Sequence, residues 1–248
     1  MVEADVTGLA VHAIVRNTRT DRALDALRLG GTEVVYRLVT AGDLAAAVTD
    51  APFRDVEEPD AAALRAHEAV VESLLRRPSL VPAPYGFLAR NEAAVRVFLE
   101  RRRHALEEAL ERLENTYEVR IHVTVGEEPD GERLAGHLRQ LNGILRGQAR
   151  AARELPGRSE EEAVAAFLVG RGEWLHLVQA ATRWEARSPH VRLRVTGPWP
   201  PYDFVRLEQG GAVIGRPESG GAGAPGASGA DGSDPSDGPG APASGGGR

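Results

Sequence analysis

The chain has 248 residues, 42% of them hydrophobic, which is enough to bury the core of one large domain or of two small ones. Its formal net charge of −6 argues against broad nucleic-acid binding, because such binding needs a basic surface to displace counterions from phosphates. The sequence contains no cysteine, which excludes disulfides, thiol catalysis and zinc held by cysteine.

The N-terminal stretch MVEADVTGLAV is acidic where a secretory signal is basic, and its apolar run is short. No part of the sequence approaches the roughly 20 consecutive apolar residues that span a bilayer. We therefore expect a cytoplasmic protein without a membrane span.

Strand-like segments open the first half of the chain. Runs of branched apolar residues predict three strands, at residues 9–15, 34–39 and 44–48. The last two are joined by a predicted turn at residues 41–43, and residues 80–88 form a further short strand-like piece.

Two helices are predicted in the same half. Asp60 is expected to cap the first helix, which ends near Arg77 before a proline. One face of it carries Leu64, His67, Val71 and Leu74.

Asn91 is expected to cap a second, long helix. Its apolar stripe consists of Val95, Leu99, Leu106, Leu110 and Leu113. Arg102 falls within this stripe, and we expect it to face solvent or an acidic partner from the other domain.

The second half alternates strand, helix, strand, helix and strand. Apolar and polar residues alternate at 117–125, which predicts a half-buried strand. A helix carries Leu134, Leu138, Leu141 and Leu145 on one face. A buried strand at 163–169, a helix at 172–185 and a strand at 191–195 follow. The pattern predicts an α+β fold with an open sheet and helices on one face. A modified ferredoxin-like topology is the nearest architecture, with one strand not placed.

Residues 210–248 hold half of the 28 glycines and almost no large apolar side chain, which predicts a disordered tail rich in Gly, Pro and Ala. A formal GxGxxG match at 221–226 follows no strand and contains Pro225, so it does not predict a dinucleotide site. The predicted organisation is an N-terminal α+β domain at 1–114, a C-terminal domain at 115–209, and the tail.

No catalytic or metal-binding constellation is evident. Seven histidines occur, and no two lie at metal-ligand spacing on one helix face. His12 and His122 fall on predicted strands, where hydrogen-bonded sheet histidines are expected. His67 interrupts an apolar helix face, and a buried imidazole there needs a hydrogen-bond partner. We predict a protein that is not an enzyme and holds no cofactor and no metal.

One segment stands out on physical grounds: residues 197–205, GPWPPYDFV, which we call the strap. It combines three prolines with three aromatic side chains, namely Pro198, Pro200, Pro201, Trp199, Tyr202 and Phe204. Prolines fix φ and remove backbone donors, so the chain should leave the sheet after residue 195 in an extended path, with Gly197 allowing the exit. Such a rigid aromatic segment can lock a domain edge or present a recognition surface to a partner.

The strap is similar to the GPWPPYSFV signature of the GvpL/GvpF gas vesicle proteins and differs from it only at Asp203. Other segments resemble family landmarks in the same order. They are residues 9–15, HEAVV at 67–71, VPAPYGF at 81–87 (compare "lPlrFGtvf"), the strand at 117–125, and AAFLV at 165–169 (compare "naaYLV"). The resemblance covers residues 8–207; Ala83 and Tyr85 depart from the middle motif, and the Gly-rich tail is an addition.

This resemblance implies two α+β domains, the second a modified ferredoxin-like fold, and a role as an accessory or minor structural protein of gas vesicles, the organelles of buoyancy. It implies two kinds of partner, the small hydrophobic shell protein and other vesicle proteins, and a location at the gas vesicle. We also predict structural roles for Gly197, His67, Pro82 and Gly86. Because an amphipathic shell subunit aggregates unless it is covered, pairing at an open sheet edge is a reasonable way to aid nucleation or assembly.

A second hypothesis belongs to a different class of function. In it the protein binds a small ligand or performs catalysis in a groove between its domains, with His67 and Arg102 as the polar groups. It requires these two side chains to converge on a concave pocket.

Overall fold

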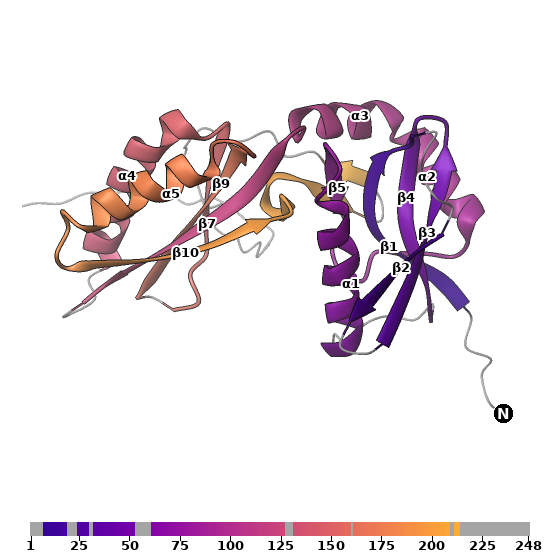
Figure 1. The fold of residues 1–248 in the computed structure, drawn as a ribbon, viewed down its shortest axis with the longest axis horizontal. Helices are drawn as coiled ribbons and strands as arrows, with labels where there is room; N and C mark the ends of the chain where they lie inside the picture. Colours follow the sequence, from indigo (N-terminus) through magenta and orange to yellow (C-terminus); the bar gives the residue numbers. More distant parts are fainter. Residues whose placement is uncertain are drawn as a thin grey trace, which may run out of the picture. The chain divides into compact units, whose positions relative to one another are not determined.

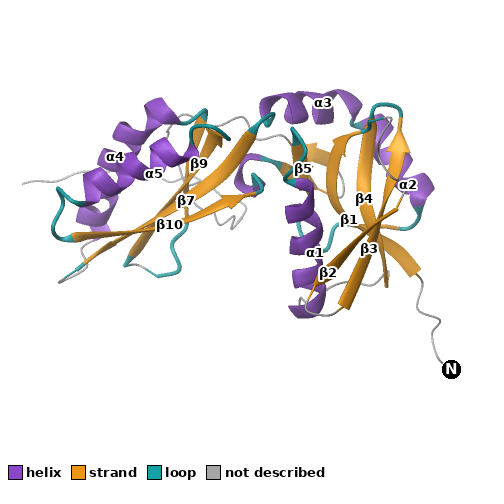
Figure 2. Ribbon diagram, in the orientation of Figure 1, coloured by secondary structure: helices purple, strands orange, loops and turns teal. Residues whose placement is uncertain are grey.

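The computed structural model describes residues 7–18, 24–29, 32–52, 61–126, 131–159, 161–208 and 211–213. These residues form two large antiparallel sheets with packed helices, so the predicted α+β class is confirmed (Figure 2). No helix in these ranges is long and apolar enough to cross a membrane.

The first half of the chain forms one antiparallel sheet and three helices. In chain order they are β1 (Thr7–Arg16), β2 (Leu24–Leu29), β3 (Thr32–Ala41), β4 (Leu44–Pro52), α1 (Ala61–Leu74), β5 (Leu80–Pro82), β6 (Leu88–Ala89), α2 (Glu92–Arg101) and α3 (Arg103–Arg112). The strands lie in the order β2-β3-β4-β1-β5, and β6 also pairs with β1. The sequence did not reveal β2, because its segment LDALRL lacks the β-branched and aromatic residues typical of strands.

Helices cover both faces of the first sheet. On one face, Val15 and Ala47 pack with Val70 and Val71 of α1. On the other face, residues such as Val39 and Val48 pack with Val95 and Leu99 of α2 and with Leu106 of α3. Strands buried on both faces are apolar at successive positions, which explains the continuous runs in β1 and β4.

The long helix expected after Asn91 is two helices, which is a correction. Its cap is confirmed, because the side chain of Asn91 accepts a hydrogen bond of 2.9 Å from the backbone N–H of Ala94. The helix ends at Arg102, where φ is −106° and ψ is 10°, and α3 begins at the next residue. A continuous helix would have placed the Arg102 side chain in the apolar stripe, where burying a charge is costly.

The second half contains the other large sheet. In chain order its elements are β7 (Thr116–Val125), α4 (Gly131–Leu145), the 3₁₀ turn η1 (Arg146–Gln148), β8 (Ala151–Leu155), β9 (Glu162–Gly170), α5 (Trp174–Glu185) and β10 (Val191–Trp199). The strands lie in the order β10-β7-β9-β8, all antiparallel. The β-α-β-β-α-β chain order is that of ferredoxin-like folds. The strand that the sequence left unplaced is β8.

Helices α4 and α5 lie side by side on one face of this sheet (Figure 1). The apolar residues of β7 that alternate with polar ones, such as Ile121 and Val123, point toward them together with Phe167 of β9. The opposite face of the sheet is therefore free of these helices, and the chain after β10 returns to it.

Beyond β10 the chain forms a 3₁₀ turn, η2 (Tyr202–Phe204), and a small pair of strands, β11 (Arg206–Glu208) and β12 (Gly211–Val213). Residues 211–213, which were expected to belong to the disordered tail, are therefore a strand; residue 210 and residues 214–248 lie outside the described residues, as does the expected cap Asp60.

The cap at Asn91 can be tested directly. Replacing Asn91 with Ala should lower the free energy of unfolding by about 1 kcal/mol, because one N–H of the first turn of α2 loses its acceptor. Asn91→Ser keeps an acceptor oxygen and should behave nearly as the wild type in denaturant-induced unfolding. Equal losses in both variants would show that the cap does not contribute.

Candidate functional site

The strap begins inside the last strand of the second sheet. The expectation that the strand ends at residue 195 is wrong, because β10 continues to Trp199, whose Cα pairs with that of Glu118. The register shifts between Thr196 and Trp199, so Gly197 and Pro198 form a bulge. At Gly197 φ is +122°, and a Cβ there would lie 2.9 Å from the carbonyl oxygen of Glu118. Only glycine can occupy position 197 without a shift of the backbone, because any other residue would bring a Cβ too close to this oxygen.

The three aromatic side chains of the strap have different surroundings. Phe204, 8% exposed, belongs to the apolar cluster that contains Ala166 and Leu168 of β9. Tyr202 packs against the cluster formed around α1. Trp199 is 37% exposed. The structure thus separates two inward-facing aromatic groups from one that is accessible to a partner.

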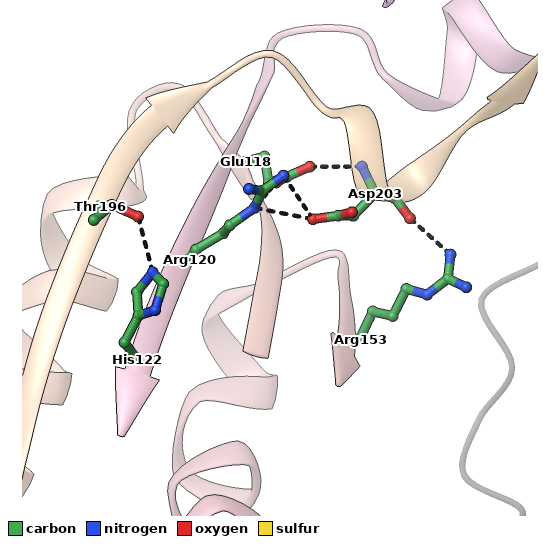
Figure 3. Close-up of polar contacts among 6 residues, drawn as sticks. All are labelled: Glu118, Arg120, His122, Arg153, Thr196 and Asp203. Carbon is green, nitrogen blue, oxygen red and sulfur yellow. Dashed lines mark hydrogen bonds and ion pairs between the residues drawn. The ribbon is translucent and has the colours of Figure 1, made fainter. Parts of the chain in front are cut away.

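The strap crosses the face of the second sheet that α4 and α5 leave uncovered. On β7 the side chains of Glu118, Arg120 and His122 point to this face, because they alternate with the apolar residues that face the helices. Asp203, in the η2 turn of the strap, lies opposite Glu118 and Arg120 (Figure 3).

One guanidinium group joins two carboxyl groups at this contact. Nε of Arg120 donates to Oε1 of Glu118 at 2.7 Å and to Oδ2 of Asp203 at 3.0 Å. The backbone N–H of Asp203 donates to Oε2 of Glu118 at 2.8 Å, and Arg153 of β8 donates to the carbonyl oxygen of Asp203 at 2.9 Å (Figure 3). We call Glu118, Arg120 and Asp203 the latch triad.

Glu118 is a fully buried acid, with 0% of its surface exposed. Burial raises its pKa to about 8, and the nearby carboxylate of Asp203 acts in the same direction. The N–H of Asp203 and the charge of Arg120 oppose this rise without cancelling it. The carboxyl group therefore changes its charge close to neutral pH.

A second polar cluster lies on the same face. His122, expected to be a hydrogen-bonded sheet histidine, has its Nδ1 2.9 Å from Oε1 of Glu162, which confirms that expectation. Arg194 of β10 also reaches Glu162, at 3.1 Å. Burial lowers the pKa of His122, so its ring is neutral at neutral pH.

The strap and β8 border an open hollow of about 280 Å³. It is lined by Arg153, Glu154, Leu155, Pro156, Tyr202, Asp203, Val205 and Arg206. Neither His67 nor Arg102, the two groups of the ligand-binding hypothesis, lines this hollow.

His67 instead forms a buried pair with His12. Their Nδ1 atoms lie 2.9 Å apart, so one ring donates a hydrogen bond to the other, and Nε2 of His12 lies 2.9 Å from the hydroxyl of Thr49. His12 is the extra residue where the β1–β4 register shifts, and the bulge aims its ring toward α1. Burial lowers the pKa of His12 to about 3, with the proximity of His67 adding to it, and burial also lowers the pKa of His67.

The other two residues expected to be structural lie near this pair. Pro82 is buried at the end of β5 and pairs with Ala13 of β1. Gly86 has a φ of +83°, a conformation that favours glycine. Within the described residues, no group of three or more His, Cys, Asp or Glu side chains is placed to hold a metal ion.

Sequence comparison assigns the fold and the strap to one family. The family model described as gas vesicle synthesis protein GvpL/GvpF matches residues 8–143 and 130–206, which include the latch triad and the strap up to its last residue. The chain belongs to the GvpL/GvpF family of gas vesicle proteins. This is a gas vesicle structural family that is not known to be catalytic.

Individual relatives agree with this assignment. The chain is 27% identical to gas vesicle protein L of a Streptomyces species over 227 residues, covering 74% of this chain and 83% of that protein. It is also 27% identical to gas vesicle protein F2 of Halobacterium salinarum over 199 residues, covering 75% and 88%. The crystal structure of the gas vesicle protein GvpF from an Anabaena species has a TM-score of 0.61 at 16% identity, over 82% of this chain and 99% of that one. This last likeness establishes the fold.

The latch triad should contribute to the stability of this family member. Replacing Arg120 with Met leaves the buried oxygen of Glu118 and the carboxylate of Asp203 without their shared donor, which should cost about 2 kcal/mol in chemical denaturation. Arg96→Met, which removes an exposed partner of Glu92 on α2, is the matched control and should cost less than about 1 kcal/mol. Equal effects would contradict a special role for Arg120.

The His12–His67 pair predicts a loss of stability in acid. The folded state holds both rings neutral, whereas the unfolded chain takes up protons below a pH of about 6.5. The stability that wild type has over His67→Gln should therefore shrink as pH falls below 6.5, by up to about 1.4 kcal/mol per pH unit. His104→Gln alters an exposed histidine and is the matched control in the same urea titrations. A constant difference between wild type and His67→Gln would contradict the prediction.

Proposed function

We propose that this protein is an accessory protein of gas vesicle formation that binds the small hydrophobic shell protein, together with other vesicle proteins, and aids nucleation or assembly. The family assignment supports the vesicle context, and the exposed end of β10 supports a binding surface there. Gly197, Pro198 and Trp199 are all exposed at this end of the strand.

Strand β10 is an edge of the second sheet in the part of the chain that the structure describes. An edge strand has unpaired N–H and C=O groups on one side and can add a strand from a partner. A partly exposed tryptophan beside such an edge provides a large apolar contact, and tryptophan is enriched among residues that dominate binding energy. A shell subunit with an apolar face could use both the edge and Trp199.

The observation that carries this proposal is the outward placement of Trp199, while Tyr202 and Phe204 of the same segment face inward. The role of the strap is therefore divided: two aromatic side chains lock the strap and one remains for a partner. The rival small-ligand hypothesis gains no comparable support, because His67 is only 4% exposed and bonded to His12.

The test measures binding of the purified protein to the purified shell subunit by co-sedimentation. The affinity of each variant is then compared with that of the wild type. Trp199→Ala should weaken binding at least about tenfold, equivalent to about 1.4 kcal/mol. Leu175→Ala removes another exposed apolar side chain, 52% exposed on α5 and on the opposite side of the sheet, and should leave the affinity unchanged.

Two results would oppose the proposal. If the wild type binds neither the shell subunit nor other vesicle proteins, the accessory role is wrong. If the wild type binds and Leu175→Ala weakens binding more than Trp199→Ala, the binding surface lies on the helical side.

A further inference from the structure

The latch triad holds more negative than positive charge when both acids are ionised. Glu118 and Asp203 share the single guanidinium of Arg120, and the other cation at the contact, Arg153, binds a backbone carbonyl oxygen instead of a carboxylate. Because Glu118 has no exposed surface, water cannot screen the charge of its own carboxylate, whereas Asp203 is partly exposed. Two carboxylates in such a site are most stable when they retain one proton.

The charged groups of neighbouring elements do not remove this excess. From α1, Glu68 and Glu72 act on Tyr202 of the strap, and their charge is also negative. From α3, Arg112 donates to the carbonyl oxygen of Phe204. His122, two residues along β7, has a lowered pKa and carries no charge at neutral pH.

The strap covers apolar surface. Phe204 and Val205 lie in the same buried cluster as Ala166 and Leu168 of β9, which face the strap side of the second sheet. Beyond Trp199, the hydrogen bonds between the strap and β7 come from the triad. Protonation of the triad can therefore change how firmly the strap is held, while the sheet and its helices keep their own core.

We propose that the strap is a proton-controlled latch: it closes on the open face of the second sheet while Glu118 and Asp203 share one proton, and it opens as that proton is lost, uncovering the apolar residues of β9. Asp203 is essential to this behaviour. The family signature to which the strap is similar has serine at this position, which would leave one carboxylate for one guanidinium. The inference does not depend on the identity of the partner in the proposed function.

The direction of the pH effect follows from linkage. In the closed strap the pKa of Glu118 is about 8, whereas an open strap exposes the carboxyl group to water and returns its pKa toward 4.5. The opening equilibrium therefore rises with pH between these two values and is level above about 8. Between pH 6.5 and 8 opening should increase by up to about tenfold per pH unit and level off near 8, or about 15-fold in all.

Amide hydrogen exchange of the full-length chain measures this opening. The reporter is the strap, and above all the N–H of Asp203, which is bonded to Glu118 in the closed state. After correction for the intrinsic effect of pH on exchange, protection of the amides of residues 202–207 should fall about 15-fold from pH 6.5 to 8. Protection of α4 should stay constant, because its packing does not involve the triad.

Three variants identify the titrating pair. Glu118→Gln should give strap protection that is independent of pH over this range, because the proton-binding group is gone. Asp203→Ser should reduce the pH dependence of strap protection, because Glu118 is then the single carboxyl group bonded to Arg120. Glu154→Gln removes a carboxylate of the adjacent hollow that is outside the triad, and it should retain the wild-type response.

The latch is refuted if strap protection in the wild type does not change between pH 6.5 and 8, or if Glu118→Gln retains the wild-type slope. It is also refuted if α4 loses protection in parallel, since that result indicates global unfolding. Direct titration of the Glu118 carboxyl carbon by NMR needs no variant, and a midpoint near 4.5 would overturn the proposal.

Discussion

The contact of Arg120 with Glu118 and Asp203 is the interaction on which the placement of the strap depends. It joins residues more than 80 positions apart and holds the η2 turn against β7 through one guanidinium group. The bulge at Gly197 makes the contact possible, because it lets β10 continue past Pro198 before the chain turns back over the sheet. The polar contact and the apolar burial of Phe204 then reinforce each other: one sets the position of the strap and the other excludes water from the buried acid.

The sequence was most informative where the pattern of side chains is local. Alternation at 117–125 predicted β7, and helical spacing of leucines predicted α4, because each element buries one face. It failed for β8, because the segment AAREL has no β-branched or aromatic residue and its strand conformation comes from pairing with β9. It also failed at Arg102, where the cost of burying a charge divides one helix into two.

The candidate site could be found only in part. The strap was recognisable from its prolines and aromatic residues, and its family signature identified the class of protein. The polar residues of β7 gave no such signal, since Glu118 and Arg120 occupy positions that face solvent in an ordinary half-covered sheet. Their burial arises from a distant segment that folds back over them. The one indication in the sequence was the acidic residue Asp203 at a position where the signature has serine.

The apolar cluster beneath the strap also affects how this protein can be divided. It contains residues of the first sheet, of α3, of β9 and of the strap, so both halves of the chain contribute to one core. A fragment cut at the junction after residue 114 would retain its own sheet and helices but expose apolar side chains that the other half now covers. Each half should consequently be less soluble when it is expressed alone than as part of the full chain. Co-expression of the two halves should restore part of their solubility. Sequence boundaries between sheets are therefore a poor guide to which pieces of such a chain can evolve or be engineered independently.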